Sequence, residues 1–380
     1  MERAVGHKGK RLKKIVGIAA AVIAFLILCI FLFAHSYISK INRAEALSKN
    51  AVIGENSAPA DNPEEDSNLE ADSSTGEPSI KDASTEQVSS AEEAIRKNME
   101  DKSTSVLADK NVFNILLIGT DNREKGENSR SDAMILLSIN KKSKTITSAS
   151  LLRDIYLQIP GKNNNRLNAA YAYGGPTLLM DTIEQNFKVS VDRYVSVDFY
   201  VFMDIIDAVG GVTIDVTKEE IPIINNYLAE LNSLKGEKEG TDYLQEPGQL
   251  KLNGKQALAY ARNRYIGTDF ERTARQRRVL NEAFQKVKKL NLLQLNGLLN
   301  KLLPQVTTNL TEGEIFSMIL SLPKYAGYEI SQSHIPADNS YQFMRIRGME
   351  VITLDFDKNI KALQEQLYPD QSKQELTVNR

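Results

Sequence analysis

The chain has 380 residues, of which 25% are charged and 42% apolar, and its formal net charge is −2. This composition is ordinary for a globular protein, and the near-neutral charge gives no support for nucleic-acid binding. The single cysteine, Cys29, lies in an apolar N-terminal stretch. Disulfides, thiol nucleophiles and cysteine-ligated zinc are therefore excluded from the rest of the chain.

The first predicted element is a membrane anchor. Residues 15–34 are twenty consecutive residues without a charge. A helix of that length, at about 1.5 Å per residue, crosses a hydrocarbon core of about 30 Å. The preceding tail, residues 1–14, is basic, which favours a cytoplasmic N-terminus. A cleaved signal peptide and a buried core helix are the alternatives; signal peptides usually have a shorter apolar region. We expect the remainder of the chain outside the cell.

Residues 35–110 are predicted to be a flexible extracellular linker. The stretch 61–90 is rich in Asp, Glu, Ser, Thr, Asn and Pro and has few large apolar residues. Such a segment buries too little surface to offset the entropy lost on ordering. A short helix over 91–99 is compatible with the pattern. An extracellular globular domain is then expected over residues 111–380.

Short apolar runs alternate with helical patterns from residue 112 onward, which predicts an α/β fold: an α-β-α sandwich around a central mixed sheet. The predicted strands are 112–118, 133–139, 145–152, 194–197, 212–216, 328–333 and 351–354. The predicted helices are 176–187, 200–208, 254–261, 273–290, 292–303, 312–320 and 357–367.

Aspartates and arginines gather at the ends of these elements. Asp121 follows the first strand and Asp132 begins the second, so the two carboxylates could converge on one Mg²⁺ or Mn²⁺ ion. Guanidinium groups bind phosphate oxygens through two parallel hydrogen bonds. Such a set indicates a pyrophosphate site, although loop aspartates are commonly turn formers or caps. The candidate arginines at these positions are Arg130, Arg153, Arg262, Arg264, Arg272 and Arg275.

The spacing of these arginines in the sequence divides them into groups that face different ways. Arg262 and Arg264 point the same way on an extended segment, whereas Arg272 and Gln276 share a face of one helix. On that helix Arg275, Arg277 and Arg278 are interpreted as a solvated face.

Other kinds of catalytic site find no support. His334 is the one histidine after residue 35 and is interpreted as structural, so a serine–histidine triad is unsupported. The chain also lacks a glycine-rich phosphate loop.

These motifs together resemble the LytR-CpsA-Psr (LCP) family over about residues 112–290. The motifs occur in the same order as in LCP proteins, and the predicted membrane anchor also matches the organisation of that family. The matching segments are 114–121, 130–132, 152–154, 166–175, 209–212, 252–264 and the spaced set Asp269, Arg272 and Gln276. Two positions depart from the family pattern: Leu152 replaces a usual proline, and Ala169 replaces a frequent histidine.

The resemblance implies a phosphotransferase. LCP proteins move a glycopolymer, such as teichoic acid or capsule, from a polyprenyl-pyrophosphate carrier to a sugar hydroxyl of peptidoglycan. On this basis Asp121 and Asp132 are the expected metal ligands, and Arg153 is the expected catalytic arginine. The implied pyrophosphate contacts are Arg130, Arg153, Arg262, Arg264, Arg272 and Gln276.

The carrier is a long lipid, so we expect an apolar pocket beside this site. The helix predicted over 200–208 could line it, through Tyr200, Phe202, Met203, Ile206 and Val209. The base for the acceptor hydroxyl stays open between Asp154 and Asp121. A lipid-pyrophosphate pyrophosphatase that uses water, and a non-catalytic envelope regulator or binding protein, remain alternatives.

Overall fold

The computed structural model describes residues 80–120 and 131–369. Asp121, Arg130 and the predicted anchor over 15–34 lie outside these residues. Within the described part of the chain, no helix is both long and apolar enough to cross a membrane.

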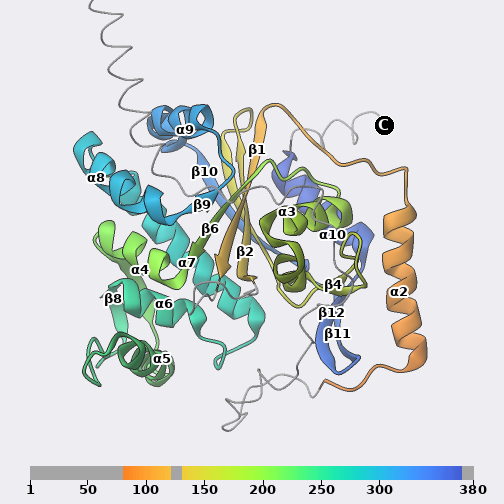
Figure 1. Ribbon diagram of the computed structural model, residues 1–380, viewed down its shortest axis with the longest axis horizontal. Helices are drawn as coiled ribbons and strands as arrows, with labels where there is room; N and C mark the ends of the chain where they lie inside the picture. Colours follow the sequence, from red (N-terminus) through yellow and green to blue (C-terminus); the bar gives the residue numbers. More distant parts are fainter. Residues whose placement is uncertain (1–79, 121–130, 370–380) are drawn as a thin grey trace, which may run out of the picture.

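A mixed six-stranded sheet forms the centre of the fold, in the order β10-β3-β2-β1-β6-β9 (Figure 1). The pairs β10–β3 and β1–β6 are parallel, and the other neighbours are antiparallel. The α/β class with a central mixed sheet is therefore confirmed. The sheet strands are β1 (Val112–Thr120), β2 (Ser131–Asn140), β3 (Thr145–Leu151), β6 (Arg193–Asp198), β9 (Thr307–Thr308) and β10 (Glu329–Ile335).

Three two-stranded sheets lie outside the central one, and helices cover both of its faces. The hairpins pair β4 (Tyr156–Leu157) with β5 (Asn165–Arg166), β7 (Val212–Val216) with β8 (Gly248–Leu252), and β11 (Tyr341–Ile346) with β12 (Met349–Leu354). The helices are α2 (Thr85–Glu100), α3 (Leu167–Phe187), α4 (Phe199–Ala208), α5 (Glu220–Lys235), α6 (Gly254–Arg262), α7 (Asp269–Val287), α8 (Leu292–Leu302), the 3₁₀ turn η2 (Leu303–Gln305), α9 (Glu312–Tyr325) and α10 (Phe356–Leu367).

The alternation of side chains along the strands separates two cores. Leu116, Leu136 and Ala149 are completely buried on the face covered by α3 and α10. On the other face Ile139 and Ile146 pack with Phe284 of α7. A further core joins α4, α5, α6 and α7 with the β7–β8 hairpin. Successive side chains of a strand point to opposite faces of the sheet. Since these strands carry apolar residues at odd and at even positions, both faces of the sheet must be covered by helices.

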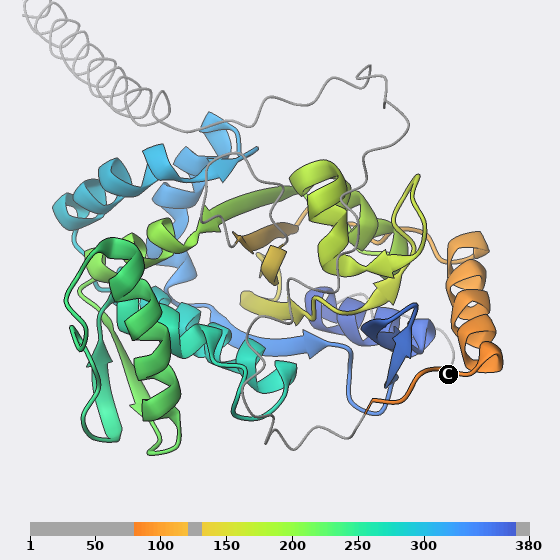
Figure 2. The same cartoon turned by 60° about the horizontal axis from the view of Figure 1, so that its bottom comes forward.

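The expected linker is wrong for its last part, because α2 packs on the domain. Ser84 caps this helix in a reciprocal capping box with Gln87. Ala91 and Ile95, one turn apart, are buried in the large core, and Asn98 Nδ2 donates to the Asn186 carbonyl oxygen at 3.0 Å. Figure 2 shows α2 in orange beside α10 and the β11–β12 hairpin.

Two glycines shape the elements near the site. Gly175 has φ +65° and interrupts α3 immediately before Pro176, which is why the sequence predicted the start of this helix at 176. Gly254 begins α6 where a Cβ would lie 2.3 Å from the Met203 carbonyl oxygen, so α6 and α4 approach closely. Asn253 caps α6 through a capping box with Gln256.

Candidate functional site

Strand pairing brings Asp132 to Arg153. In the β2–β3 ladder Ile135 lies opposite Ser150. Continuing this antiparallel register by three residues sets Asp132, in β2, opposite Arg153, just after β3. The side chains meet there, with Arg153 NH1 donating to Asp132 Oδ1 at 3.0 Å. The convergence predicted from sequence was that of Asp132 with Asp121, which lies outside the described residues; the structure brings Asp132 to Arg153.

Asp154 and Arg166 extend this pair into a row of alternating charges. Arg153 Nε lies 3.4 Å from Asp154 Oδ2, and Arg166 NH1 donates to Asp154 Oδ1 at 3.2 Å. All three side chains are at most 20% exposed. Because both Asp154 oxygens face arginines, this carboxylate orients Arg153 and is poorly placed to accept a proton.

The first turn of α7 brings a second ion pair to the same place. Thr268 and Glu271 form a capping box that starts this helix. Asp269 Oδ1 lies 2.6 Å from Arg272 NH2, and Arg272 is only 3% exposed. The amino end of a helix carries partial positive charge, so this turn favours an anionic ligand.

The charges of the two ion pairs act on one another. Burial raises the pKa of the Asp132 carboxyl, but Arg153, Arg272 and Arg264 outweigh it, and the net pKa is below the ordinary value. Burial also raises the pKa of Asp269, and there it prevails over Arg272. The pKa of Arg272 is lowered, again mainly by burial. The surrounding arginines therefore favour the anionic form of Asp132, whereas burial makes the Asp269 carboxyl hold its proton more strongly than an ordinary aspartate.

Several buried polar atoms at this place have no hydrogen-bond partner. They are Arg272 Nε, Asp269 Oδ2 and Gln276 Oε1. Buried polar groups are almost always satisfied, and the exceptions call for an explanation. These open donors and acceptors all lie on α7 and are compatible with a polar ligand there. The expected contacts of Arg272 and Gln276 with a pyrophosphate stay a prediction.

Arg264 and Arg262 occupy different positions. Arg264 lies after α6, and its charge acts on Asp132 and Asp269. Arg262 instead lies over the rings of Phe199 and Tyr227, 4.8 Å and 4.9 Å from their centroids. Its NH1 is also 3.5 Å from Glu230. Arg264 belongs to the charged cluster, while Arg262 is held to one side of it by two aromatic rings.

The expected solvated face of α7 is wrong for two of its three arginines. Arg275 is buried: its Nε donates to Glu220 Oε1 at 2.8 Å, and its other nitrogens donate to the Asn263 and Ile266 carbonyls. Arg277 is 7% exposed and faces no acidic partner in the described part of the chain. Arg278 is exposed, and it donates to the Tyr260 hydroxyl at 3.0 Å.

The donor set fits a magnesium site in part. Asp132 offers an ionised carboxylate whose Oδ2 is not used by Arg153, and Mg²⁺ prefers one or two carboxylates together with phosphate oxygens and water. The second expected ligand, Asp121, lies outside the described residues. Within them, no group of three acidic, histidine or cysteine residues is arranged to hold a metal.

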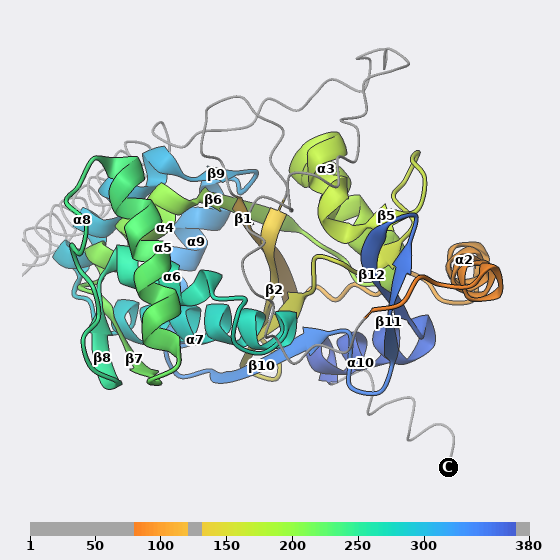
Figure 3. The ribbon, with the colours of Figure 1, turned by 90° about the horizontal axis from the view of Figure 1, so that it is seen from below.

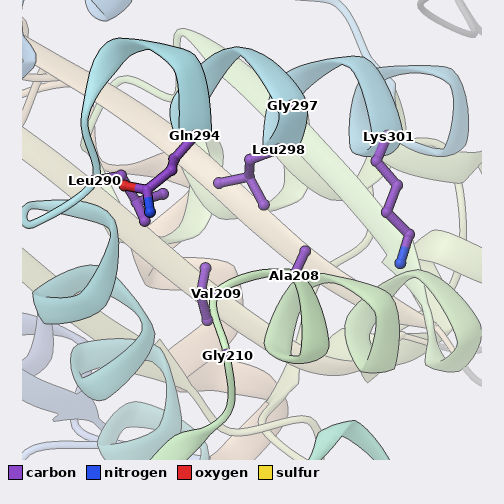
Figure 4. A pocket seen from close by; sticks show the side chains of 8 residues that line it. All are labelled: Ala208, Val209, Gly210, Leu290, Gln294, Gly297, Leu298 and Lys301. Atoms are coloured by element: carbon purple, nitrogen blue, oxygen red, sulfur yellow. The ribbon is translucent and has the colours of Figure 1, made fainter.

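A pocket of about 440 Å³ lies between α4 and α8 (Figure 4). Of the five residues expected to line a lipid pocket, Val209 lines this one. Met203 and Ile206 pack in cores, Phe202 packs against them, and Tyr200 is 44% exposed. The five therefore do not form one continuous lining. The pocket is lined by Ala208, Val209, Gly210, Leu290, Gln294, Gly297, Leu298 and Lys301.

The site and the fold agree with a family comparison. The model of the LytR_cpsA_psr family matches residues 79–367, which is most of the chain. This chain belongs to the LytR_cpsA_psr family. The match begins before α2, in agreement with the packing of that helix on the domain.

Relatives within the LytR_cpsA_psr family have transferase and regulatory names. Biofilm regulatory protein A of Streptococcus mutans is 34% identical over 59% of this chain and 55% of its own length. The Enterococcus faecalis polyisoprenyl-teichoic acid–peptidoglycan teichoic acid transferase TagU is 36% identical over 50% of this chain and 58% of its own length. The TagU protein of Bacillus licheniformis is 32% identical over 67% of this chain and 78% of its own length. The chain thus matches little more than half the length of the first two.

Solved structures of the LytR_cpsA_psr family share the fold. The structure "TagT bound to LIIa-WTA" is 27% identical, with a TM-score of 0.56, over 68% of this chain and 91% of that one. "LytR-CPS2A-psr family protein YwtF (TagT) with bound octaprenyl pyrophosphate lipid" is 27% identical, with a TM-score of 0.51, over the same shares.

Asp269 and Arg166 were missed as site residues by reasoning from sequence. Asp269 is recognisable from its place, since an acidic first-turn residue three positions before Arg272 shares its face. Arg166 has no comparable signal. Its contact with Asp154 depends on the β4–β5 hairpin, which returns the chain to the end of β3.

Proposed function

We propose that this protein is a phosphotransferase that moves a glycopolymer from a polyprenyl-pyrophosphate carrier to a sugar hydroxyl of peptidoglycan. The observation that carries this proposal is the cluster of Asp132, Arg153, Asp269 and Arg272, with open donors and acceptors around it. The names of the TagU relatives and the octaprenyl pyrophosphate of a solved relative support it.

The arginines would neutralise the pyrophosphate during transfer. The acceptor oxygen attacks the phosphorus that bears the polymer, a new P–O bond forms, and the bridging P–O bond breaks to release polyprenyl phosphate. Charge then grows on the leaving phosphate, where Arg153 and Arg272 would stabilise it. Asp132, with Asp121, would hold Mg²⁺, which when bound neutralises phosphate oxygens.

Asp269 is our candidate for the base. The attacking hydroxyl must lose its proton, and an acceptor works best when its pKa lies near the operating pH. Burial raises the pKa of Asp269 toward that range, and its Oδ2 has no partner. Asp154, left open from the sequence, has both oxygens occupied by Arg153 and Arg166.

The lipid would lie between α4 and α8, in the pocket that contains Val209. We further propose that residues 15–34 anchor the protein in the membrane and hold the domain close to the carrier, outside the cell. This arrangement would bring the lipid, the pyrophosphate and the wall acceptor to one domain.

The test is a reconstituted transfer reaction. Full-length protein in detergent is given a short-chain polyprenyl-pyrophosphate donor with a radiolabelled polymer, and isolated peptidoglycan is the acceptor. We expect label to become phosphodiester-linked to peptidoglycan as polyprenyl phosphate is released, and we expect Asp132→Asn to reduce both. Release of polyprenyl phosphate without label on peptidoglycan would instead identify a pyrophosphatase.

A regulatory role is the second candidate, because one relative is named a biofilm regulatory protein. A purely regulatory domain would not need a buried ion-pair cluster with unsatisfied donors. If wild-type protein binds the donor but neither transfers nor hydrolyses it, the regulatory role is favoured.

A further inference from the structure

Four aromatic side chains form a continuous row that starts at the site. Phe270, in the first turn of α7, has its ring centroid 5.0 Å from that of His334 and 5.1 Å from that of Tyr341. Tyr341 is 5.5 Å from Phe343, two residues further along β11. In Figure 3 the β11–β12 hairpin lies beyond the end of β10, which carries His334. We call Phe270, His334, Tyr341 and Phe343 the aromatic row.

The aromatic row is open to solvent at its outer end. Along β11, Met344 and Ile346 point into the large core, whereas Phe343 is 37% exposed. His334 is about one quarter exposed, and Phe270 and Tyr341 are partly buried. Phe270 and Tyr341 pack against the large core. Packing does not require an aromatic ring at Phe343, which is among the exposed large apolar residues of the described chain.

The row begins in the same helical turn as Asp269 and Arg272. Phe270 directly follows Asp269, the candidate base, and precedes Arg272 by two residues in the first turn of α7. A ligand that lies along the row would thus reach the amino end of α7, which carries these charged residues. The pocket proposed for the lipid, by contrast, lies between α4 and α8, and these two helices are far from β11 in Figure 1.

Aromatic rings in a row suit sugars. One face of a pyranose ring presents several C–H groups, which carry slight positive charge and pack on the negative face of an aromatic ring. Carboxylates beside such rings accept hydrogen bonds from sugar hydroxyls. Two lie near Tyr341: burial raises the pKa of its hydroxyl, and the charges of Asp338 and Glu271 raise it further.

The same carboxylates discriminate between donor and acceptor. A teichoic acid carries negative phosphates, which Asp338 and Glu271 would repel, whereas a sugar hydroxyl of a wall glycan carries no charge. We propose that the aromatic row is the acceptor subsite, which binds the pyranose rings of the peptidoglycan glycan chain and directs one hydroxyl to Asp269. This inference rests on the proposed function.

Three variants test it. Phe343→Ala removes the most exposed ring, Phe343→Trp keeps an aromatic face, and Leu234→Ala is the control. Leu234 is 54% exposed and lies on α5, on the opposite side of the domain in Figure 1. Circular dichroism and thermal unfolding establish first that each variant is folded.

Two readouts separate this inference from the proposed function. The first is the KM for peptidoglycan in the transfer assay, with the donor KM alongside. The second is sedimentation of protein with isolated peptidoglycan, without donor. We expect Phe343→Ala to weaken both acceptor readouts about three- to tenfold, as for loss of one aromatic contact, and to change the donor KM less. Phe343→Trp should restore binding, and Leu234→Ala should match wild type.

Distinct results would overturn each idea. If wild-type protein transfers polymer and Phe343→Ala has an unchanged acceptor KM, the acceptor subsite is wrong and the function stands. If wild type shows no transfer but Phe343→Ala loses peptidoglycan binding, the row binds glycan and the proposed reaction is wrong. If Phe343→Ala raises the donor KM instead, the row binds the polymer of the donor, and the assignment to the acceptor fails.

Discussion

Replacing Arg153 with lysine tests the proposed phosphate chemistry most directly. Arg153 uses two nitrogens for two carboxylates, with NH1 3.0 Å from Asp132 and Nε 3.4 Å from Asp154. A lysine keeps the charge but has one ammonium group, which cannot reproduce this fork. The variant therefore lacks the guanidinium that Asp132 and Asp154 would orient toward the leaving phosphate. Loss of one preorganised contact costs about 10²–10³ in rate, or about 3–4 kcal/mol.

The effect on folding should be smaller. Arg153 is 16% exposed, and lysine retains the charge that faces Asp132, so we expect a loss of at most about 1.5–3 kcal/mol, the range for a charged hydrogen bond. The assay compares kcat and KM for the lipid-pyrophosphate donor with urea unfolding of the same preparation. We expect kcat to fall about 100- to 1,000-fold, with a smaller change in donor KM.

Arg193→Lys is the matched control. Arg193 makes a similar fork to Glu314, with nitrogen–oxygen distances of 2.7 and 2.8 Å, at the start of β6. That end of the parallel β1–β6 pair is opposite to the end where the site lies. Activity of Arg193→Lys should stay near wild type. A kcat for Arg153→Lys within twofold of wild type, or an equal loss in Arg193→Lys, would refute the reasoning.

Three further outcomes are expected. Asp269→Asn should gain stability relative to wild type as pH rises above about 4, because the raised pKa of Asp269 makes its ionisation costly in the folded state. Asp132→Asn should lose stability relative to wild type as pH rises toward about 4 from below, because the lowered pKa of Asp132 lets it ionise first in the folded state, and the difference should stay constant at higher pH. Urea unfolding between about pH 2 and 8 measures both variants, and parallel curves would contradict the assigned shifts. Arg277→Met should stabilise the fold, since it removes a buried charge that faces no acidic partner among the described residues; urea unfolding measures this, and a less stable variant would contradict it. Excess chelator should reduce transfer and added Mg²⁺ should restore it, and full activity in chelator would remove the metal from the proposal.

Local patterns predicted most of the sheet and its helices because their signals lie within a few residues. β7 was predicted with its observed bounds, and α4 and α6 within one residue. The helix α5 was missed: its apolar positions face β7, β8 and α6, and it includes Pro222. The start of α3 was missed because Gly174 and Gly175 interrupt the helical pattern.

Some features of the charged cluster could likewise be predicted from the sequence, and others could not. Asp132, Arg153 and Arg272 could be predicted because strand ends and helix starts gather at one edge of a sheet. The burial of Arg275 could not, since its partner Glu220 lies 55 residues away, on an unpredicted helix. Nor could the separation of Arg262 from the cluster, because it depends on two rings supplied by α4 and α5.

The contacts of Arg275 bear on how this family can diversify. Its guanidinium holds the segment after α6 through the carbonyl oxygens of Asn263 and Ile266, while Glu220 fixes the guanidinium itself. Main-chain carbonyls are present whatever side chains the segment carries. Residues such as Tyr265 can therefore be exchanged during evolution without moving Arg264, so side-chain variation in this segment need not alter the charged cluster on which Arg264 acts.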